Sequence, residues 1–100
     1  MSEGDWGFAP PPFDAQEALQ RLRRDLRELG LTEREGRWER RGVAIAKVQA
    51  AAPVIEASRV RRPSRNSPEW LARSLHHSAD VRDFVADLKK QLALWNDNDD

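Results

Sequence analysis

Apolar residues recur with helical spacing in the segment 15–29. They stand four and three residues apart, at Ala15, Leu19, Leu22, Leu26 and Leu29. This spacing predicts a helix with one apolar stripe. Asp14 before the stripe and Glu17 three residues later form the pattern of a capped helix start. Gly30 suits the left-handed residue that follows a helix, and Leu31 would then fold back onto the last turn.

A second helical stripe lies near the end of the chain. Its apolar residues are Val81, Phe84, Val85, Leu88, Leu92 and Trp95. Upstream, the Ser-Pro-Glu segment 67–69 is typical of a helix start, so we expect a short helix that carries Trp70, Leu71 and Leu75. At about 100° per residue, Leu71 and Leu75 would point away from the C-terminal stripe. We therefore expect a break between two helices at residues 76–78.

Between the helical segments the pattern changes to short runs separated by turn residues. The runs are 36–41 around Trp38, 43–48 and 54–61. Gly42 separates the first two runs, and Ala52-Pro53 separates the last two. The economical interpretation is three antiparallel strands with short connections. Alternation in the middle run is imperfect, which a bulge or a twist would reconcile.

These elements predict an α+β fold of order α-β-β-β-α(α). A three-stranded antiparallel sheet is covered on one face by two helices. The chain divides into a Pro/Gly/aromatic arm (1–12), a single domain (13–95) and a disordered acidic tail (96–100). The centre of the core is expected at Leu19, Leu22, Leu26, Phe84, Val85, Leu88 and Leu92. Trp6 and Phe8 in the arm either dock on the domain or belong to a partner-binding or disordered segment.

Length and composition limit the classes of function. One hundred residues make one domain, and 39% hydrophobic with 34% charged residues indicates a small core with long solvated faces. The absence of cysteine excludes disulfides, thiolate nucleophiles and cysteine-based metal sites. No stretch approaches the roughly 20 apolar residues of a membrane span, and the acidic N-terminus does not resemble a secretory signal. We expect a cytoplasmic protein without a membrane association.

Positive charge is concentrated in the predicted sheet. The net charge of the chain is zero, but residues 34–65 contain nine basic and three acidic residues, a local charge of +6. An anionic partner would bind there. The candidate site residues are Arg37, Arg41, Lys47, Arg59, Arg61, Arg62, Arg65 and the aromatic Trp38, which could stack on a base. In the alternative interpretation these arginines cover apolar sheet and pair with acidic residues inside the fold.

The sequence shows no arrangement of serine, histidine or carboxylate residues that is typical of a catalytic site. The serines have no nucleophile-elbow context, and the adjacent His76 and His77 diverge too far on a helix to chelate one metal. Asp80, Asp83 and Asp87 share a helical side at a spacing that could hold a divalent cation, but a solvated face is the simpler interpretation. We expect no catalytic, cofactor-binding or metal-binding residues, no cofactor and no enzymatic activity.

Two resemblances follow from these segments. The order helix, three strands, helix, with a basic loop before the last helical region, resembles the double-stranded RNA-binding domain. The lysine cluster of that family is replaced here by Ser67-Pro68-Glu69, and its Gly-Pro-x-His loop is absent. The segments 10–14, 18–22, 67–70 and 78–84 also resemble short uncharacterised bacterial proteins, a resemblance that implies no activity.

The sequence thus leaves two functions open. The first is a small non-enzymatic adaptor that makes protein–protein contacts. The alternative is a protein that binds RNA or DNA through an arginine-rich sheet face. The chain is expected to be a monomer or a weak homodimer, since an exposed edge strand can pair with its own copy.

Overall fold

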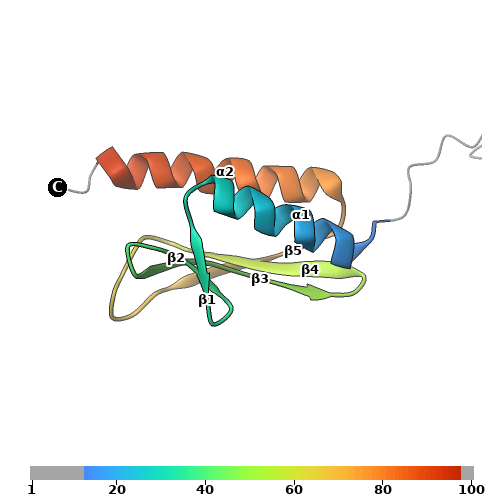
Figure 1. The fold of residues 1–100 in the computed structure, drawn as a ribbon, viewed down its shortest axis with the longest axis horizontal. Coiled ribbons are helices and arrows are strands. Elements are labelled where there is room, and N and C mark those ends of the chain that lie inside the picture. The colour runs from blue at the N-terminus through green and yellow to red at the C-terminus, as the bar shows by residue number, and fades with distance from the viewer. Residues whose placement is uncertain (1–12, 98–100) are drawn as a thin grey trace, which may run out of the picture.

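The fold is a five-stranded antiparallel sheet with two helices on one face. The computed structural model describes residues 13–97. The elements are α1 (Ala15–Glu28), β1 (Thr32–Arg34), β2 (Arg37–Arg40), β3 (Val43–Ala51), β4 (Val54–Val60), β5 (Trp70–Leu75) and α2 (Ser78–Asp97). The strands pair in sequence order, and α1 and α2 run in the same direction over one face (Figure 1). The expected arm 1–12 and residues 98–100 of the expected tail lie outside the described residues.

The expected α+β class with a helix-covered antiparallel sheet is confirmed, but the prediction of three strands is wrong. The additional strands are β1 and β5, one at each edge of the sheet. The observed order therefore also differs from the helix, three strands, helix order on which the resemblance to the double-stranded RNA-binding domain rested.

Strand β5 occupies the segment expected to form a short helix. It pairs with β4 from Ile55 opposite Leu75 to Val60 opposite Trp70. A helix here would have left one edge of β4 unpaired, and the cost of unpaired backbone groups outweighs the local Ser-Pro-Glu signal. The expected break at residues 76–78 is present, although it separates a strand from α2.

Strand β1 was not predicted from the sequence, because its three residues are all exposed and show no alternation of apolar and polar positions. Its turn into β2 is formed by Glu35 and Gly36, with φ angles of 52° and 82°. Two consecutive positive φ angles define the type I′ turn that suits a two-residue hairpin. The β2–β3 turn repeats this design with Arg41 and Gly42, at φ 56° and 78°.

A β-bulge in β3 resolves the imperfect alternation seen in the sequence. Trp38 pairs with Ala46, but the next residue, Glu39, pairs with Ala44, so Ile45 is the extra residue. Because of this extra residue, the alternation of helix-facing and open-face positions in β3 is out of phase before and after the bulge. Beyond the bulge, the row from Ala50 through Ile55 to Leu75 faces the helices and is mostly buried.

Helix α1 begins and ends as its sequence predicts. The Asp14 carboxylate accepts hydrogen bonds from the backbone N–H groups of Gln16 and Glu17 at 3.0 and 3.1 Å. Gly30 has φ 91°, and the N–H of Leu31 donates to the carbonyl of Leu26 at 3.1 Å. This is the Schellman arrangement, which places Leu31 in the core.

The core lies between the sheet and the two helices. Leu22, Leu26 and Leu88 are fully buried, and Phe84 is 1% exposed. Leu19 and Leu92 are also buried, whereas Val85 is only partly buried at the rim. The sheet contributes the largest buried side chain, Trp38, together with Ile55 and Leu75.

Candidate anion-binding cleft

A cleft of about 570 Å³ lies where the β2–β3 turn, the loop 61–69 and the C-terminal end of α2 meet. Nine residues line it: Arg40, Arg41, Val43, Ile45, Arg62, Pro63, Ser64, Arg65 and Trp95. Four of them are arginines, and none of these described residues is acidic. We refer to this feature as the arginine cleft.

The β2–β3 hairpin supplies two of the arginines. The type I′ turn at Arg41 and Gly42 follows Arg40 directly, so both cations stand at the hairpin tip. The Arg40 Nη1 group donates a hydrogen bond to the carbonyl of Leu92 at 3.4 Å. The last turn of α2 carries no basic residue of its own, so Arg40 places a cation near the negative end of the helix dipole. This contact fixes the hairpin against α2.

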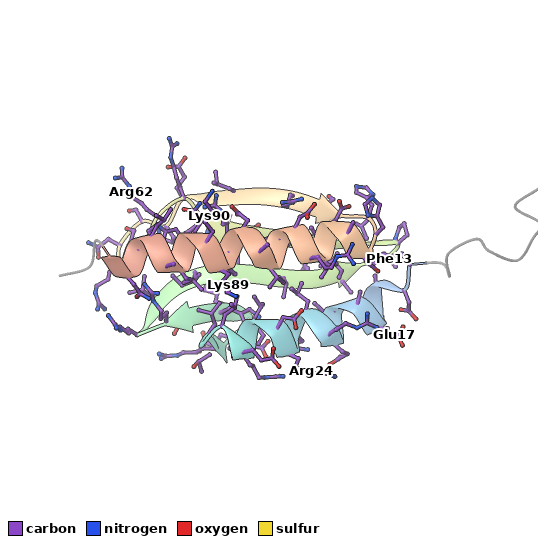
Figure 2. All side chains as sticks on the ribbon, turned by 90° about the horizontal axis from the view of Figure 1, so that it is seen from above. Phe13, Glu17, Arg24, Arg62, Lys89 and Lys90 are labelled. Atoms are coloured by element: carbon purple, nitrogen blue, oxygen red, sulfur yellow. The ribbon has the colours of Figure 1, made fainter. Side chains whose placement is uncertain are left out.

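The other two arginines come from the loop between β4 and β5. The N–H of Arg61 donates to the carbonyl of Glu69 at 2.9 Å, which closes the neck of the loop. Within the loop, Ser64 Oγ accepts from the N–H of Ser67 at 3.1 Å, a local turn typical of serine. Figure 2 shows Arg62 at the end of the molecule where α2 terminates, extending away from the ribbon.

Arg62 and Arg65 have no carboxylate partner among the side chains that the structure describes, those of residues 13–96. Their charges are therefore not neutralised by the described part of the fold. Guanidinium groups form planar, bidentate contacts with carboxylates and phosphates. Several such groups around one cleft, without an intervening acid, favour an anion.

The apolar residues of the cleft add a second kind of recognition. Val43, Ile45, Pro63 and Trp95 provide hydrocarbon and ring surface beside the arginines. Ile45 is fully buried, whereas Trp95 is partly exposed. A ligand that combines anionic groups with an apolar or planar group would match this combination.

Only three of the eight candidate residues from the sequence meet in this cleft, namely Arg41, Arg62 and Arg65. Two others are used inside the fold. Arg59 Nε lies 2.6 Å from Asp87 Oδ2, and the two side chains are 18% and 36% exposed. Arg61 Nη1 lies 3.5 Å from Glu69 Oε2 in an exposed pair that contributes little.

Lys47 and Arg37 lie on the open face of the sheet, opposite each other in β3 and β2. The Lys47 ammonium is 4.3 Å from the centre of the Trp70 ring, a cation–π contact. The adjoining row contains Glu56, whose carboxylate accepts a hydrogen bond from Ser74 Oγ at 3.0 Å. The open face is therefore mixed in charge and is not a continuous basic surface.

The expectation that Trp38 stacks on a base must be corrected. Trp38 is 1% exposed and packs in the core, and the Arg27 guanidinium carbon lies 5.7 Å from its ring centre. Its strand is polar, so the sequence suggested an exposed ring. The ring instead points toward the helices, because the pairing of Trp38 with Ala46 puts both on the covered face.

Six of the nine cleft residues were not among the candidates from the sequence, and Arg40 and Trp95 are the two of these with a charged or a large aromatic side chain. Arg40 belonged to the basic stretch but was not singled out, and Trp95 was assigned to the helical stripe alone. The available signal was the position of each residue at the end of its element. Arg40 ends a predicted strand and Trp95 falls in the last turn of a predicted helix, and both elements end on the same side of the domain.

A second depression lies between the first turns of α1 and α2, beside His76 and His77. The Asp14 carboxylate caps α1, and the Asp80 carboxylate in the first turn of α2 accepts the N–H of His76, just before that helix, at 2.8 Å. This hydrogen bond lowers the pKa of Asp80 below its ordinary value, and the two histidines nearby act in the same direction. The Asp14 and Asp80 carboxylates therefore serve to hold the starts of the two helices in place.

Among the described side chains of residues 13–96, no three histidine or carboxylate groups gather into a cluster that could hold a metal ion. No helix in the same range is both long and apolar enough to cross a membrane. Comparison with protein-family models, curated proteins and solved structures found no significant match.

Proposed function

We propose that this protein is a small non-enzymatic adaptor that binds an acidic segment of a partner protein in the arginine cleft. The observation that carries the proposal is the lining of the cleft, four arginines beside apolar surface with no carboxylate among them. Aspartate, glutamate or phosphorylated side chains would pair with the guanidinium groups. A neighbouring apolar side chain of the same segment would contact Trp95 and Pro63.

The distribution of charge favours a compact acidic segment over a nucleic acid. A nucleic-acid strand needs a basic track that follows several phosphates. Cations without a carboxylate partner in the described residues lie in separate places, among them Arg34 and Arg37 on the β1–β2 hairpin and Arg62 and Arg65 at the cleft. Along β2, Glu39 stands between Arg37 and the hairpin tip at the cleft, which interrupts a track.

An NMR titration of the full chain tests this proposal. The probe is a blocked peptide of about nine residues that repeats Asp-Glu-Phe, and its neutral counterpart repeats Asn-Gln-Phe. We expect shifts of the Arg62 and Arg65 amides and of the Trp95 indole with the acidic peptide alone. A variant with Arg62→Glu and Arg65→Glu should bind roughly tenfold more weakly or worse.

The matched control reverses two arginines elsewhere. Arg34→Glu with Arg37→Glu makes the same change of charge on the open face and should leave peptide binding nearly unchanged. The alternative function is tested with single-stranded DNA and duplex RNA. If these shift Arg37 and Lys47, with a steep salt dependence and loss in the Arg34/Arg37 variant, then the sheet face binds nucleic acid and the adaptor proposal is wrong.

A further inference from the structure

The two edges of the sheet are protected very differently. The β1 edge is a three-residue strand, and its Glu33 is held by Arg23 of α1 at 2.7 Å. The β5 edge is six residues long, and all six pair with β4 without a bulge. Residues 71–74 are exposed, and no strand within residues 13–97 covers their outer side. Short, charged edges resist strand addition, whereas long regular ones invite it.

The direction of the free backbone groups of β5 follows from the β4–β5 ladder. The Arg61 N–H donates to Glu69 in the same register as the ladder. Hydrogen-bonded pairs alternate along an antiparallel ladder. Leu71, Arg73 and Leu75 therefore bond to β4. The N–H and C=O groups of the alternate residues, Trp70, Ala72 and Ser74, point outward from the sheet.

These observations indicate which strand would pair with the free edge of β5. We propose that a second copy of this chain pairs its own β5 with this edge, antiparallel and centred on Ala72. A two-fold axis perpendicular to the sheet then joins two five-stranded sheets into one, with the helices of both copies on the same side. Ala72 faces Ala72 of the other copy, and Trp70 faces Ser74.

The pairing register of the two β5 strands is selected by the side chains that would face each other and by the His76 N–H, which already donates to Asp80. Centring the ladder on Arg73 would place two like charges directly opposite each other, which is destabilising. It would also pair Trp70 with His76, whose N–H is already donated to Asp80. Centring it on Leu71 would bring Pro68, which has no N–H, opposite Ser74. The Ala72 register avoids all three conflicts.

The side chains on the helix-covered side also match in this register. Arg73 of one copy would lie opposite Leu71 of the other, which is 40% exposed and can be covered by the arginine stem. Leu71 pairs with Arg59, which is bound to Asp87. The Arg59 cation in this row is already neutralised by Asp87, so it does not oppose the incoming Arg73. The pairs Ala72 with Ala72, Trp70 with Ser74 and Leu71 with Arg73 arise when the added strand is itself β5, which favours a second copy of the chain over an unrelated strand.

Sedimentation of the full chain over a range of concentrations provides the first test. We expect the mass to rise with concentration from 11.5 kDa toward twice that value. Ala72→Pro removes an outward N–H that makes no bond within the chain, and proline is tolerated at such an edge position. This variant should remain a monomer with an unchanged circular dichroism spectrum. The control, Ala72→Thr, keeps the N–H and should still dimerise.

A second variant keeps the test decisive if Ala72→Pro does not fold. Leu71→Arg changes an exposed side chain and places it opposite Arg73 of the other copy, so it should also give a monomer. Because the chain has no cysteine, Ala72→Cys introduces a single thiol. Facing Cα atoms about 5.5 Å apart permit a disulfide. Mild oxidation should cross-link this variant, whereas Lys89→Cys, at an exposed position of α2, should not cross-link (Figure 2).

Three results would overturn the proposal. The first is a wild-type chain that stays monomeric at all concentrations. The second is a dimer that persists unchanged in both Ala72→Pro and Leu71→Arg. The third is cross-linking of Lys89→Cys at the same rate as Ala72→Cys. None of these results bears on peptide binding in the arginine cleft, so the two proposals stand or fall separately.

Discussion

Arg59 Nε lies 2.6 Å from Asp87 Oδ2, and this contact joins β4 to the middle of α2. Arg59 is 18% exposed, and its Nη1 group also donates to the carbonyl of Val60 at 2.9 Å. A guanidinium in this position would be costly without a carboxylate, because the helices cover most of it. A residue expected to bind an anionic partner therefore serves to hold the domain together.

Removing the carboxylate should measurably destabilise the domain. We expect Asp87→Asn to lower the free energy of unfolding by about 1–2 kcal/mol, since it leaves Arg59 without its charged acceptor in a partly buried place. Urea denaturation measures the change. Asp83→Asn, one turn earlier on α2, changes a carboxylate that makes no hydrogen bond within the described residues and should change stability by less than about 0.5 kcal/mol. Equal effects of the two substitutions would show that the ion pair contributes nothing.

The core is tested by truncation of buried leucines. Leu22 in α1 and Leu88 in α2 are both fully buried. Replacing either by alanine should cost about 2–5 kcal/mol, because the removed methyl groups leave a cavity that the surroundings fill only in part. The matched control is Leu94→Ala on the same helix as Leu88. Leu94 is 46% exposed, so its truncation should have little effect on the melting temperature.

How far the sequence predicts the fold depends on whether an element is defined locally. Helix α1 has its stripe, its Asp14 cap and its Gly30 ending within the segment itself, so it was predicted correctly. Strand β5 is defined by the unpaired edge of β4, and residues 67–69 just before it carry the local signal of a helix start. The class of fold could therefore be predicted, while the number of strands could not.

The same reasoning applies to the site. The basic stretch of the sequence correctly indicated where cations gather, and it included Arg41, Arg62 and Arg65 of the cleft. It could not show that Arg59 pairs with a helix residue 28 positions later. It also could not show that Trp95 joins the cleft, because that position depends on where α2 ends relative to the β2–β3 turn.

The β1–β2 turn offers a stabilising substitution. Glu35 has φ 52°, a left-handed conformation that is unfavourable for most residues and less so for asparagine. Asn-Gly is the preferred pair for a type I′ turn, so Glu35→Asn should raise stability by up to about 1 kcal/mol. Glu35→Gln removes the same charge without this backbone preference and should not stabilise. If the glutamine variant gains as much as asparagine, then charge and not conformation is responsible.

The start of α2 should make stability dependent on pH. The backbone hydrogen bond from His76 lowers the pKa of Asp80 below the ordinary value of 3.8. A carboxyl group whose pKa is lower in the folded state stabilises the fold above its unfolded pKa. This contribution is lost as the pH falls through the folded pKa. Asp80→Asn should therefore lower the melting temperature at neutral pH, and the difference from wild type should shrink below about pH 3.8.

The control for this pH dependence is Asp25→Asn in α1, whose carboxylate makes no hydrogen bond in the structure. Thermal denaturation of the wild type and both variants, followed by circular dichroism from neutral to acid pH, makes the comparison. The wild type and Asp80→Asn curves should converge in acid, because protonation removes the charged acceptor that the substitution also removes. A difference that stays constant through the acid range would mean that the Asp80 carboxylate is not stabilised by its contact with His76.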